Sequence, residues 1–429
     1  MSKKVSFYTF GCRLNQSETA VIQNGLEANG YDVVNFDKEA DIVVVNTCTV
    51  TEGGDADTRR LVHKVNRLFP NAKIALVGCQ AQVQKEALAH LPNVGWVVGN
   101  ARKMELGKVF DEFPPSDNVA VVAPTIERQP FVQEVAAVDR DHTRANIKIQ
   151  DGCDFFCSFC EIPYARGRAR SRVFNDILRE ANTLAQATHQ EIVLTGINVG
   201  TYAHEGKTLI DVVKGIAAIN DVKRIRISSI EPTTVPVELF DLMGQGKLCR
   251  YLHLPLQAGS DEILAAMKRK YTIGEYADFI NKAKAQVPQI CIGTDIIVGF
   301  PGETPKHFEE TLDNVREWPI DYVHVFSYSP RYMAKSRLAE DRVSSTEVTR
   351  RSNLLREMSN RKRLVYHQSL LGTIQTVLLE HYKDGYWTGL TDQYVRVKIK
   401  TDGDRWNHLL KVRLTKLDGL SVIGEMVND

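Results

Sequence analysis

The sequence predicts an α/β protein with an N-terminal open parallel α/β sheet, a central partial (β/α)6 barrel and a small C-terminal antiparallel β-barrel. Short β-branched runs alternate with helical patterns before residue 112, which is typical of βαβ units. The alternation starts again near residue 144 and repeats six times. After residue 371, short strand-like runs are divided by Gly and Asp turns.

The N-terminal part, residues 1–118, is expected to form the open sheet. Its β-branched runs, such as DIVVVNT and KIALVG, are of the kind that parallel sheets bury. Ser17 is of the residue type that caps helices, so we expect a helix to begin there. A Pro-containing stretch at 112–118 ends the pattern, and 119–143 is expected to be a linker. The expected strands are 5–10, 41–47 and 73–78, and the expected helices are near 17–29, 55–69 and 81–90.

The central part, residues 144–370, ends in a charged helical run at 345–370, and the small barrel follows at 371–429. In (β/α) barrels the active site lies at the carboxyl ends of the strands. The expected strands of the partial barrel are 145–150, 191–196, 224–229, 251–256, 290–300 and 322–326, with helices at 174–188, 208–219 and 274–286. The expected strands of the small barrel are 373–382, 385–391, 394–400, 408–417 and 421–427.

Composition limits the class of protein. The 429 residues carry a formal net charge of +1, with 43% hydrophobic and 25% charged residues, as in ordinary globular proteins. No apolar run has the roughly 18 residues that a membrane span needs, and the first residues lack a signal-peptide core. We therefore expect a cytoplasmic protein. Disulfides are rare in a reducing compartment, so disulfide bonding does not explain the eight cysteines. Metal binding or catalysis is therefore favoured.

Three cysteines lie in one loop with the spacing C-x3-C-x2-C: Cys153, Cys157 and Cys160. Three thiolates would leave one iron of a 4Fe-4S cluster open, where a ligand with amine and carboxylate groups could chelate. Phe159 offers an apolar face for a flat heterocycle such as adenine. The alternatives are a zinc site completed by a distant histidine, for which upstream His142 is a poor candidate, and three structural cysteines.

Three further cysteines, Cys12, Cys48 and Cys79, each follow the end of a predicted parallel strand. The carboxyl ends of such strands meet at one edge of the sheet, where α/β proteins bind ligands. A second metal site is therefore expected, although free cysteines are often buried core residues instead. Cys249 and Cys291 lack such a position and are expected in the core.

Four arginines alternate directly after the cysteine loop: Arg166, Arg168, Arg170 and Arg172. A run of charges usually forms a solvated face. The family resemblance described below implies an RNA substrate, and because this run directly follows the proposed metal loop, we then expect it to contact RNA phosphates.

With these motifs identified, the chain resembles the methylthiotransferases of the radical S-adenosylmethionine (SAM) superfamily. The resemblance covers essentially the whole length, and the C-terminal part resembles the TRAM domain, an RNA-binding module. The motifs that carry it are FGCRLNQSET (10–19), NTCTVT (46–51), VGCQAQ (77–82), DGCDFFCSFCEIPYARGRARSR (151–172), HLPLQAGSDEIL (253–264) and TDIIVGFPGET (294–304).

The resemblance implies two 4Fe-4S clusters and SAM as cofactors. Cys153, Cys157 and Cys160 would hold the cluster that cleaves SAM, and the resulting radical would take hydrogen from carbon 2 of adenine. Cys12, Cys48 and Cys79 would hold the cluster that carries the transferred sulfur. Further SAM-binding residues are expected at strand ends, where the alternative roles are turns and caps: Thr195, Gly196, Asn198, Ser228, Glu231, Gln257 and Gly299.

Branches of this family differ in substrate. FYTFGCRLNQSET and IPYARGRARSR look most like the branch that modifies N6-threonylcarbamoyladenosine at position 37 of the tRNA anticodon loop. The alternatives are isopentenyladenosine in tRNA, a ribosomal-protein aspartate, or a noncatalytic iron–sulfur RNA-binding protein, which would have no need for an open iron position. The expected partners are tRNA and an electron donor such as flavodoxin or ferredoxin, with no membrane and a monomeric chain.

Overall fold

The computed structural model describes residues 2–116, 118–133 and 143–427. These residues form two compact units. The first contains the described residues up to 133, with 150–173 and 329–338, and the second contains 143–149, 174–328 and 339–427. The cysteine loop therefore groups with the N-terminal sheet, while the two barrels share the second unit. The expected division into parts at residues 118, 143 and 370 stays a prediction.

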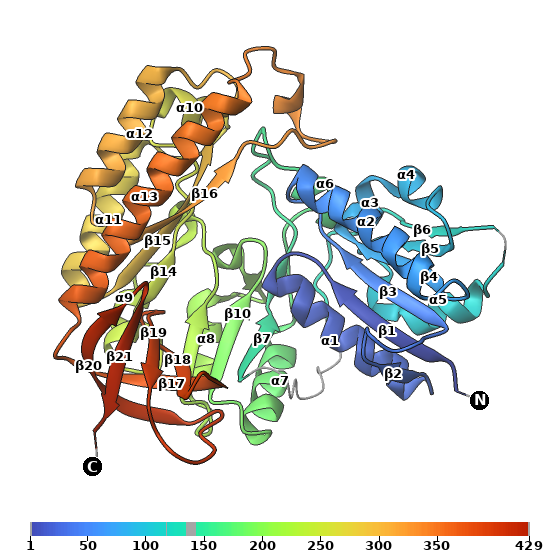
Figure 1. The fold of residues 1–429 in the computed structure, drawn as a ribbon, viewed down its shortest axis with the longest axis horizontal. Helices are drawn as coiled ribbons and strands as arrows, with labels where there is room; N and C mark the ends of the chain where they lie inside the picture. Colours follow the sequence, from blue (N-terminus) through green and yellow to red (C-terminus); the bar gives the residue numbers. More distant parts are fainter. Residues whose placement is uncertain (1, 117, 134–142, 428–429) are drawn as a thin grey trace. The chain divides into compact units, whose positions relative to one another are not determined.

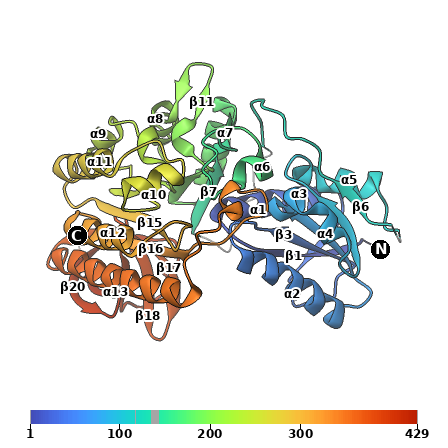
Figure 2. The same ribbon diagram turned by 90° about the horizontal axis from the view of Figure 1, so that it is seen from above.

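The first unit is built on a six-stranded parallel sheet of order β2-β1-β3-β4-β5-β6 (Figure 1). The apolar side chains of α1 and α5 pack on one face and those of α2 and α4 on the other, and Figure 2 shows α2 opposite α5. The strands are β1 (Lys4–Thr9), β2 (Asp32–Val34), β3 (Ile42–Thr47), β4 (Lys73–Gly78), β5 (Val94–Val98) and β6 (Ala120–Val122). The helices are α1 (Arg13–Ala28), α2 (Glu52–Leu68), α3 (Cys79–Val83), α4 (Lys85–Ala89) and α5 (Leu106–Glu112).

Several features of this unit differ from expectation. Strands β2 and β6 and helix α5 were not among the expected elements, and β6 lies within the segment expected to be a linker. Helix α1 begins at Arg13 rather than Ser17, and Ser17 is buried within it. The helix expected at 81–90 is two short helices, the first of which starts directly after β4. Strand β5 was not predicted, because Gly95 interrupts its apolar run.

The second unit contains the expected partial barrel of six parallel strands. Two three-stranded sheets, β7-β10-β13 and β14-β15-β16, are joined by a bridge between Ser229 and His253. The strands are β7 (Arg144–Lys148), β10 (Glu191–Thr195), β13 (Arg224–Ile227), β14 (Tyr251–His253), β15 (Cys291–Val298) and β16 (Tyr322–Ser327). The longer helices are α7 (Phe174–Gln186), α8 (Leu209–Ala217), α11 (Ile273–Gln286), α12 (Pro305–Glu317) and α13 (Ser345–Ser369).

The C-terminal strands close into the expected small barrel, in the order β17-β18-β19-β21-β20. Its core includes Trp387 and is continuous with Cys249 and Cys291 of the partial barrel, so both cysteines are buried core residues as expected. The strands are β17 (Ile374–Lys383), β18 (Tyr386–Thr391), β19 (Arg396–Ile399), β20 (Leu409–Asp418) and β21 (Ser421–Met426).

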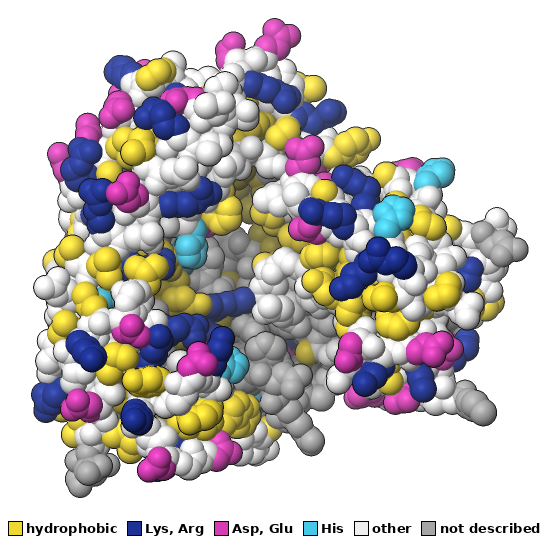
Figure 3. Space-filling view, viewed as in Figure 1, with side chains coloured by type: hydrophobic (Ala, Val, Ile, Leu, Met, Phe, Trp, Pro, Cys, Tyr) yellow, Lys and Arg dark blue, Asp and Glu magenta, His cyan; other side chains and the backbone are white. Residues whose placement is uncertain are grey.

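Charges of both signs are spread over the face of the molecule shown in Figure 3. No helix among residues 2–116, 118–133 and 143–427 combines the length and apolarity needed to cross a bilayer.

A buried ion-pair network joins the two barrels of the second unit. Glu191 accepts from Arg224 at 2.5 Å and from Arg226 at 2.7 Å, and all three side chains are at most 5% exposed. Both arginines also donate to backbone carbonyls of the small barrel between residues 390 and 392. The network therefore fixes how the small barrel packs on β10 and β13.

We expect Glu191→Gln to lower the free energy of unfolding by about 3–5 kcal/mol at pH 7, because two buried arginines lose their counter-charge. Burial raises the pKa of Glu191, but Arg224 and Arg226 hold it well below its ordinary value. The native protein thus gains stability above the unfolded-state pKa of about 4.3 and loses it as the pH falls further. Urea unfolding between pH 3 and 7 measures this. Glu205→Gln, at a side chain 84% exposed, is the matched control and should change stability by less than about 0.5 kcal/mol.

Candidate metal centre

The first set of cysteines lies at the carboxyl ends of neighbouring parallel strands. Cys48 and Cys79 directly follow β3 and β4, and Cys12 lies at the N-cap of α1 after β1. Burial, together with the neighbouring thiolates of Cys79 and Cys12, raises the pKa of Cys48 to about 11. The structure therefore brings the three thiols together at one edge of the sheet.

Two glycines make room for this arrangement, and each directly precedes a cysteine of the set. Gly11 has a φ of +90°, and a Cβ there would lie 2.6 Å from the Sγ of Cys48. Gly78 has a φ of +100°, and its Cβ would lie 2.5 Å from the Oδ1 of Asn46. Any larger residue would displace the backbone that presents the thiols.

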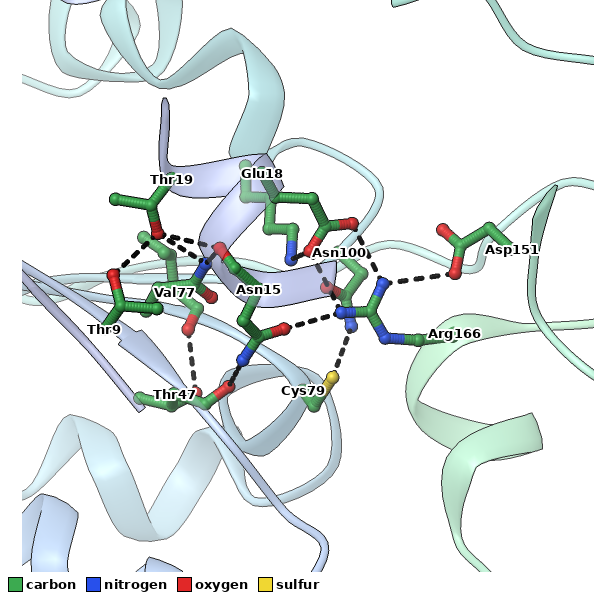
Figure 4. Close-up of polar contacts among 12 residues, drawn as sticks. Thr9, Asn15, Glu18, Thr19, Thr47, Val77, Cys79, Asn100, Asp151 and Arg166 are labelled. Atoms are coloured by element: carbon green, nitrogen blue, oxygen red, sulfur yellow. Dashed lines mark hydrogen bonds and ion pairs between the residues drawn. The ribbon is translucent and has the colours of Figure 1, made fainter. Parts of the chain in front are cut away.

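Two asparagines order the surroundings of these cysteines (Figure 4). The amide of Asn15 donates to the carbonyls of Phe10 at 2.9 Å and Thr47 at 3.1 Å, which fixes the backbone beside two of the cysteines. Asn100 donates to the Sγ of Cys79 at 3.6 Å and to a carbonyl in the helix after the cysteine loop at 2.7 Å. A hydrogen bond to sulfur stabilises the thiolate that metals require. Sequence analysis missed Asn100 because it missed β5, whose carboxyl end Asn100 follows.

The second set lies in the loop between β8 (Gln150–Asp151) and α6 (Ile162–Arg166). The N–H of Cys153 donates to the carbonyl of Gly167 at 3.1 Å, and that of Cys160 donates to Cys157 at 3.1 Å. Burial, together with the thiolates of Cys157 and Cys153, raises the pKa of Cys160 to about 12. These three thiols also converge, and the half-buried Phe159 lies among them in sequence.

The donor chemistry of each cysteine set fits an iron–sulfur cluster. Three thiolates leave one iron of a 4Fe-4S cluster without a protein ligand. Within the described part of the chain, one set of three metal-ligand side chains has its ligand atoms within 4.8 Å of one another, namely His253, Asp295 and His324. His142 lies outside the described residues.

A buried arginine joins the two cysteine sets within the first unit. Arg166, 1% exposed, donates to Glu18 of α1 at 2.9 and 3.0 Å, to Asn15 at 2.7 Å and to Asp151 at 3.1 Å (Figure 4). Lys103 pairs with the same Glu18 at 2.5 Å. The helix that begins beside Cys12 is thereby tied to the strand that enters the cysteine loop.

A second buried network joins the residues that follow Cys48 and Cys160. Thr49 donates to the carboxylate of Glu161, which also accepts from the Nε of Arg331 at 3.0 Å. Arg331 further donates to Asp55 of α2 at 2.6 Å. The loops that carry the two cysteine sets are therefore in direct side-chain contact. Sequence analysis did not identify this role of Arg331.

The four alternating arginines do not share an exposed face, contrary to expectation. Arg166 and Arg172 are at most 1% exposed, so neither is placed to meet phosphates from solvent. Their guanidinium groups are used within the fold, where Arg166 pairs with carboxylates. Arg170 is 17% exposed and Arg168 is 55% exposed beside Asp154. Arg168 is therefore the arginine of the run that remains available to RNA.

The residues expected to bind SAM all lie in the second unit at or after the ends of strands, apart from Phe159. Gln257 comes four residues after β14, because this strand ends at His253 rather than at the expected residue 256. Thr195 ends β10, Ser228 follows β13, and Gly299 follows β15. Several of them already have protein partners: Arg269 donates to Glu231, Thr234 donates to the Oδ1 of Asn198 at 3.0 Å, and the N–H of Gly299 donates to Glu303 at 3.1 Å. Their roles toward SAM stay predictions. The complete expected set is Thr195, Gly196, Asn198, Ser228, Glu231, Gln257 and Gly299.

Two family models match parts of this chain, and relatives match nearly its whole length. Residues 147–315 match the radical SAM superfamily, and residues 4–99 match the uncharacterized protein family UPF0004. A threonylcarbamoyladenosine tRNA methylthiotransferase of Aquifex aeolicus is 36% identical, covering 92% of this chain and 96% of the relative. A tRNA-2-methylthio-N6-dimethylallyladenosine synthase of Thermodesulfovibrio yellowstonii is 32% identical, covering 99% of each. The solved structure of the radical SAM methyltransferase TsrM from Kitasatospora setae has a TM-score of 0.59 at 17% identity, covering 77% of each chain.

The protein therefore contains a radical SAM domain, at residues 147–315. Among proteins with this domain, it belongs to the methylthiotransferase family.

Proposed function

We propose that the enzyme transfers a methylthio group to carbon 2 of N6-threonylcarbamoyladenosine at position 37 of the tRNA anticodon loop. The observation that carries this proposal is near-full-length similarity to relatives named for this nucleoside, at 36% identity in Aquifex aeolicus and 34% in Bacillus subtilis. The alternative substrate is isopentenyladenosine, also called dimethylallyladenosine, for which the relative at 32% identity is named.

Cys153, Cys157 and Cys160 would hold the cluster that cleaves SAM, and Cys12, Cys48 and Cys79 would hold a second 4Fe-4S cluster. When bound, these groups supply the radical and the sulfur for methylthiolation. Three cysteines in each set leave one iron position without a protein thiolate, as both roles require. The convergence of three thiols in each set supports this assignment.

The protein's own residues would position these groups. Arg166 and Glu161 join the two cysteine loops through buried polar contacts, so the distance between the clusters would be held by the fold. Asn100 would stabilise the ligand thiolate of Cys79. The seven strand-end residues and Phe159 would bind SAM, and Arg168 would contact a phosphate of the anticodon loop. We further propose that the enzyme works in the cytoplasm as a monomer, with flavodoxin or ferredoxin as electron donor.

Mass spectrometry of tRNA nucleosides from a strain that lacks this chain tests the substrate. The 2-methylthio form of N6-threonylcarbamoyladenosine should disappear and should return when the gene is restored. The 2-methylthio form of isopentenyladenosine, measured in the same digest, is the internal control and should not change. Loss of the second nucleoside with retention of the first would assign the enzyme to the other branch.

A further inference from the structure

A cavity of about 300 Å³ in the second unit is not used by the proposed chemistry. Its walls come from the amino ends of β15 and β16, from α13, and from the small barrel around residues 393–396. Gly299, by contrast, follows the carboxyl end of β15. The cavity extends from Cys291 to His324, which pairs with Asp295 in the middle of β15. At about 3.3 Å per residue, Cys291 lies roughly 23 Å and Asp295 roughly 10 Å from Val298 at the carboxyl end. A ligand at the Cys291 end of the cavity is therefore not the reacting adenosine.

The cavity is positively charged. The guanidinium of Arg363 lies over the ring of Tyr322, 4.9 Å from its centroid, and no carboxylate of the described residues pairs with it. Asp321 on the same wall is already paired with Lys284 at 2.6 Å. Arg396 adds a second cation, whose nearest carboxylate oxygen is 4.0 Å away. An arginine with no anionic partner in a cavity favours an anionic ligand.

An unsatisfied histidine lines the same cavity. His367 is 5% exposed, and its Nδ1 has no hydrogen-bond partner. Burial and the nearby Arg363 lower the pKa of His367 to about 4, so the ring is neutral near pH 7. A neutral ring can donate or accept one hydrogen bond to a base or a sugar hydroxyl. Buried polar atoms normally have a partner, so this atom points to a ligand.

The size and lining of the cavity fit a single nucleotide. Its volume is at the lower end of the range for small-ligand sites. Three tyrosines form part of the lining: Tyr322 lies under Arg363, Tyr366 under Lys284, and Tyr394 beside Tyr251. Arg363 provides the planar donor that phosphate prefers.

We propose that this cavity binds one unpaired, phosphate-bearing nucleotide of the RNA substrate, with Arg363 on the phosphate and His367 on the base or sugar. The inference rests on the proposed function, because only a polymer can occupy both this cavity and the carboxyl ends of the strands. It assigns a second RNA-binding point that is separate from the arginine run after the cysteine loop.

The test compares Arg363→Gln with Arg361→Gln on the same helix. Arg361 is 73% exposed and pairs with Glu357, outside the cavity. Fluorescence anisotropy of the cluster-loaded enzyme with an anticodon stem–loop RNA, at several salt concentrations, gives Kd and its salt dependence. We expect Arg363→Gln to weaken binding about tenfold and to reduce the salt slope by about one, because one phosphate contact is lost. Arg361→Gln should stay within about twofold of the unchanged enzyme.

Further measurements make each outcome decisive. Iron content and SAM cleavage should be unchanged in both variants, which shows that they fold. Arg363→Lys should keep the salt slope but bind severalfold more weakly, because the charge stays and the planar donor is lost.

Equal Kd and slope for Arg363→Gln and Arg361→Gln would overturn the inference while leaving the proposed function intact. If AMP alone binds through Arg363 and RNA does not, the cavity is a free-nucleotide site and the RNA inference fails. Absence of RNA binding by the unchanged enzyme would overturn both proposals.

Discussion

Replacing Cys153, Cys157 and Cys160 by Ala is expected to abolish SAM cleavage and to lower the iron content from about eight to about four atoms per chain. The three thiols converge in one loop, so their removal leaves the SAM-cleaving cluster without protein ligands. Iron analysis after anaerobic reconstitution and chromatography of 5′-deoxyadenosine measure the two effects.

The complementary variant replaces Cys12, Cys48 and Cys79 by Ala. It should also contain about four irons, but it should still cleave SAM while forming no methylthio product. Cys249→Ala is the matched control, because this cysteine is a core residue and its loss should leave about eight irons. If the variant that lacks Cys12, Cys48 and Cys79 retained about eight irons, the assignment of a second cluster to these cysteines would be refuted. Persistent SAM cleavage without the Cys153 loop would refute the assignment of that loop.

Arg166→Met is expected to lower the free energy of unfolding by about 3–5 kcal/mol. The substitution leaves Glu18 and Asp151, both at most 1% exposed, without their shared cation, although Lys103 still faces Glu18. Thermal or urea unfolding of the apoprotein measures the loss. Arg168→Met removes an arginine that is 55% exposed and should cost less than about 0.5 kcal/mol. Equal stability of the two variants would show that the buried network does not hold the cysteine loops together.

The sequence predicted the order of elements well where hydrophobic patterning decides it. β4 at 73–78, the long α13 and the five strands of the small barrel follow directly from β-branched runs, periodicity and turns. The predicted start of α1 at Ser17 was wrong. Ser17 is a strong local capping signal, but Asn15, whose amide donates to the carbonyls of residues 10 and 47, already belongs to the helix. Tertiary contacts decide that boundary.

The candidate site was predictable to the extent that it depends on spacing and on strand ends. Both cysteine sets satisfy those conditions, and the structure brings each set together. The burial of Arg166 was not predictable, because its partner Glu18 lies 148 residues away and alternating arginines are locally typical of an exposed face. Glu161 and Arg331 were missed for the same reason: they meet across 170 residues of chain.

The most direct test of the proposed function is a reaction of the reconstituted enzyme with two synthetic anticodon stem–loops. One carries N6-threonylcarbamoyladenosine at position 37, and the other carries isopentenyladenosine there. With SAM, a sulfur source and a reductant, nucleoside mass spectrometry should find the methylthio group on the first RNA and not on the second. Methylthiolation of the isopentenyladenosine RNA alone would contradict the assignment of substrate, and methylthiolation of neither RNA would contradict the assignment of activity.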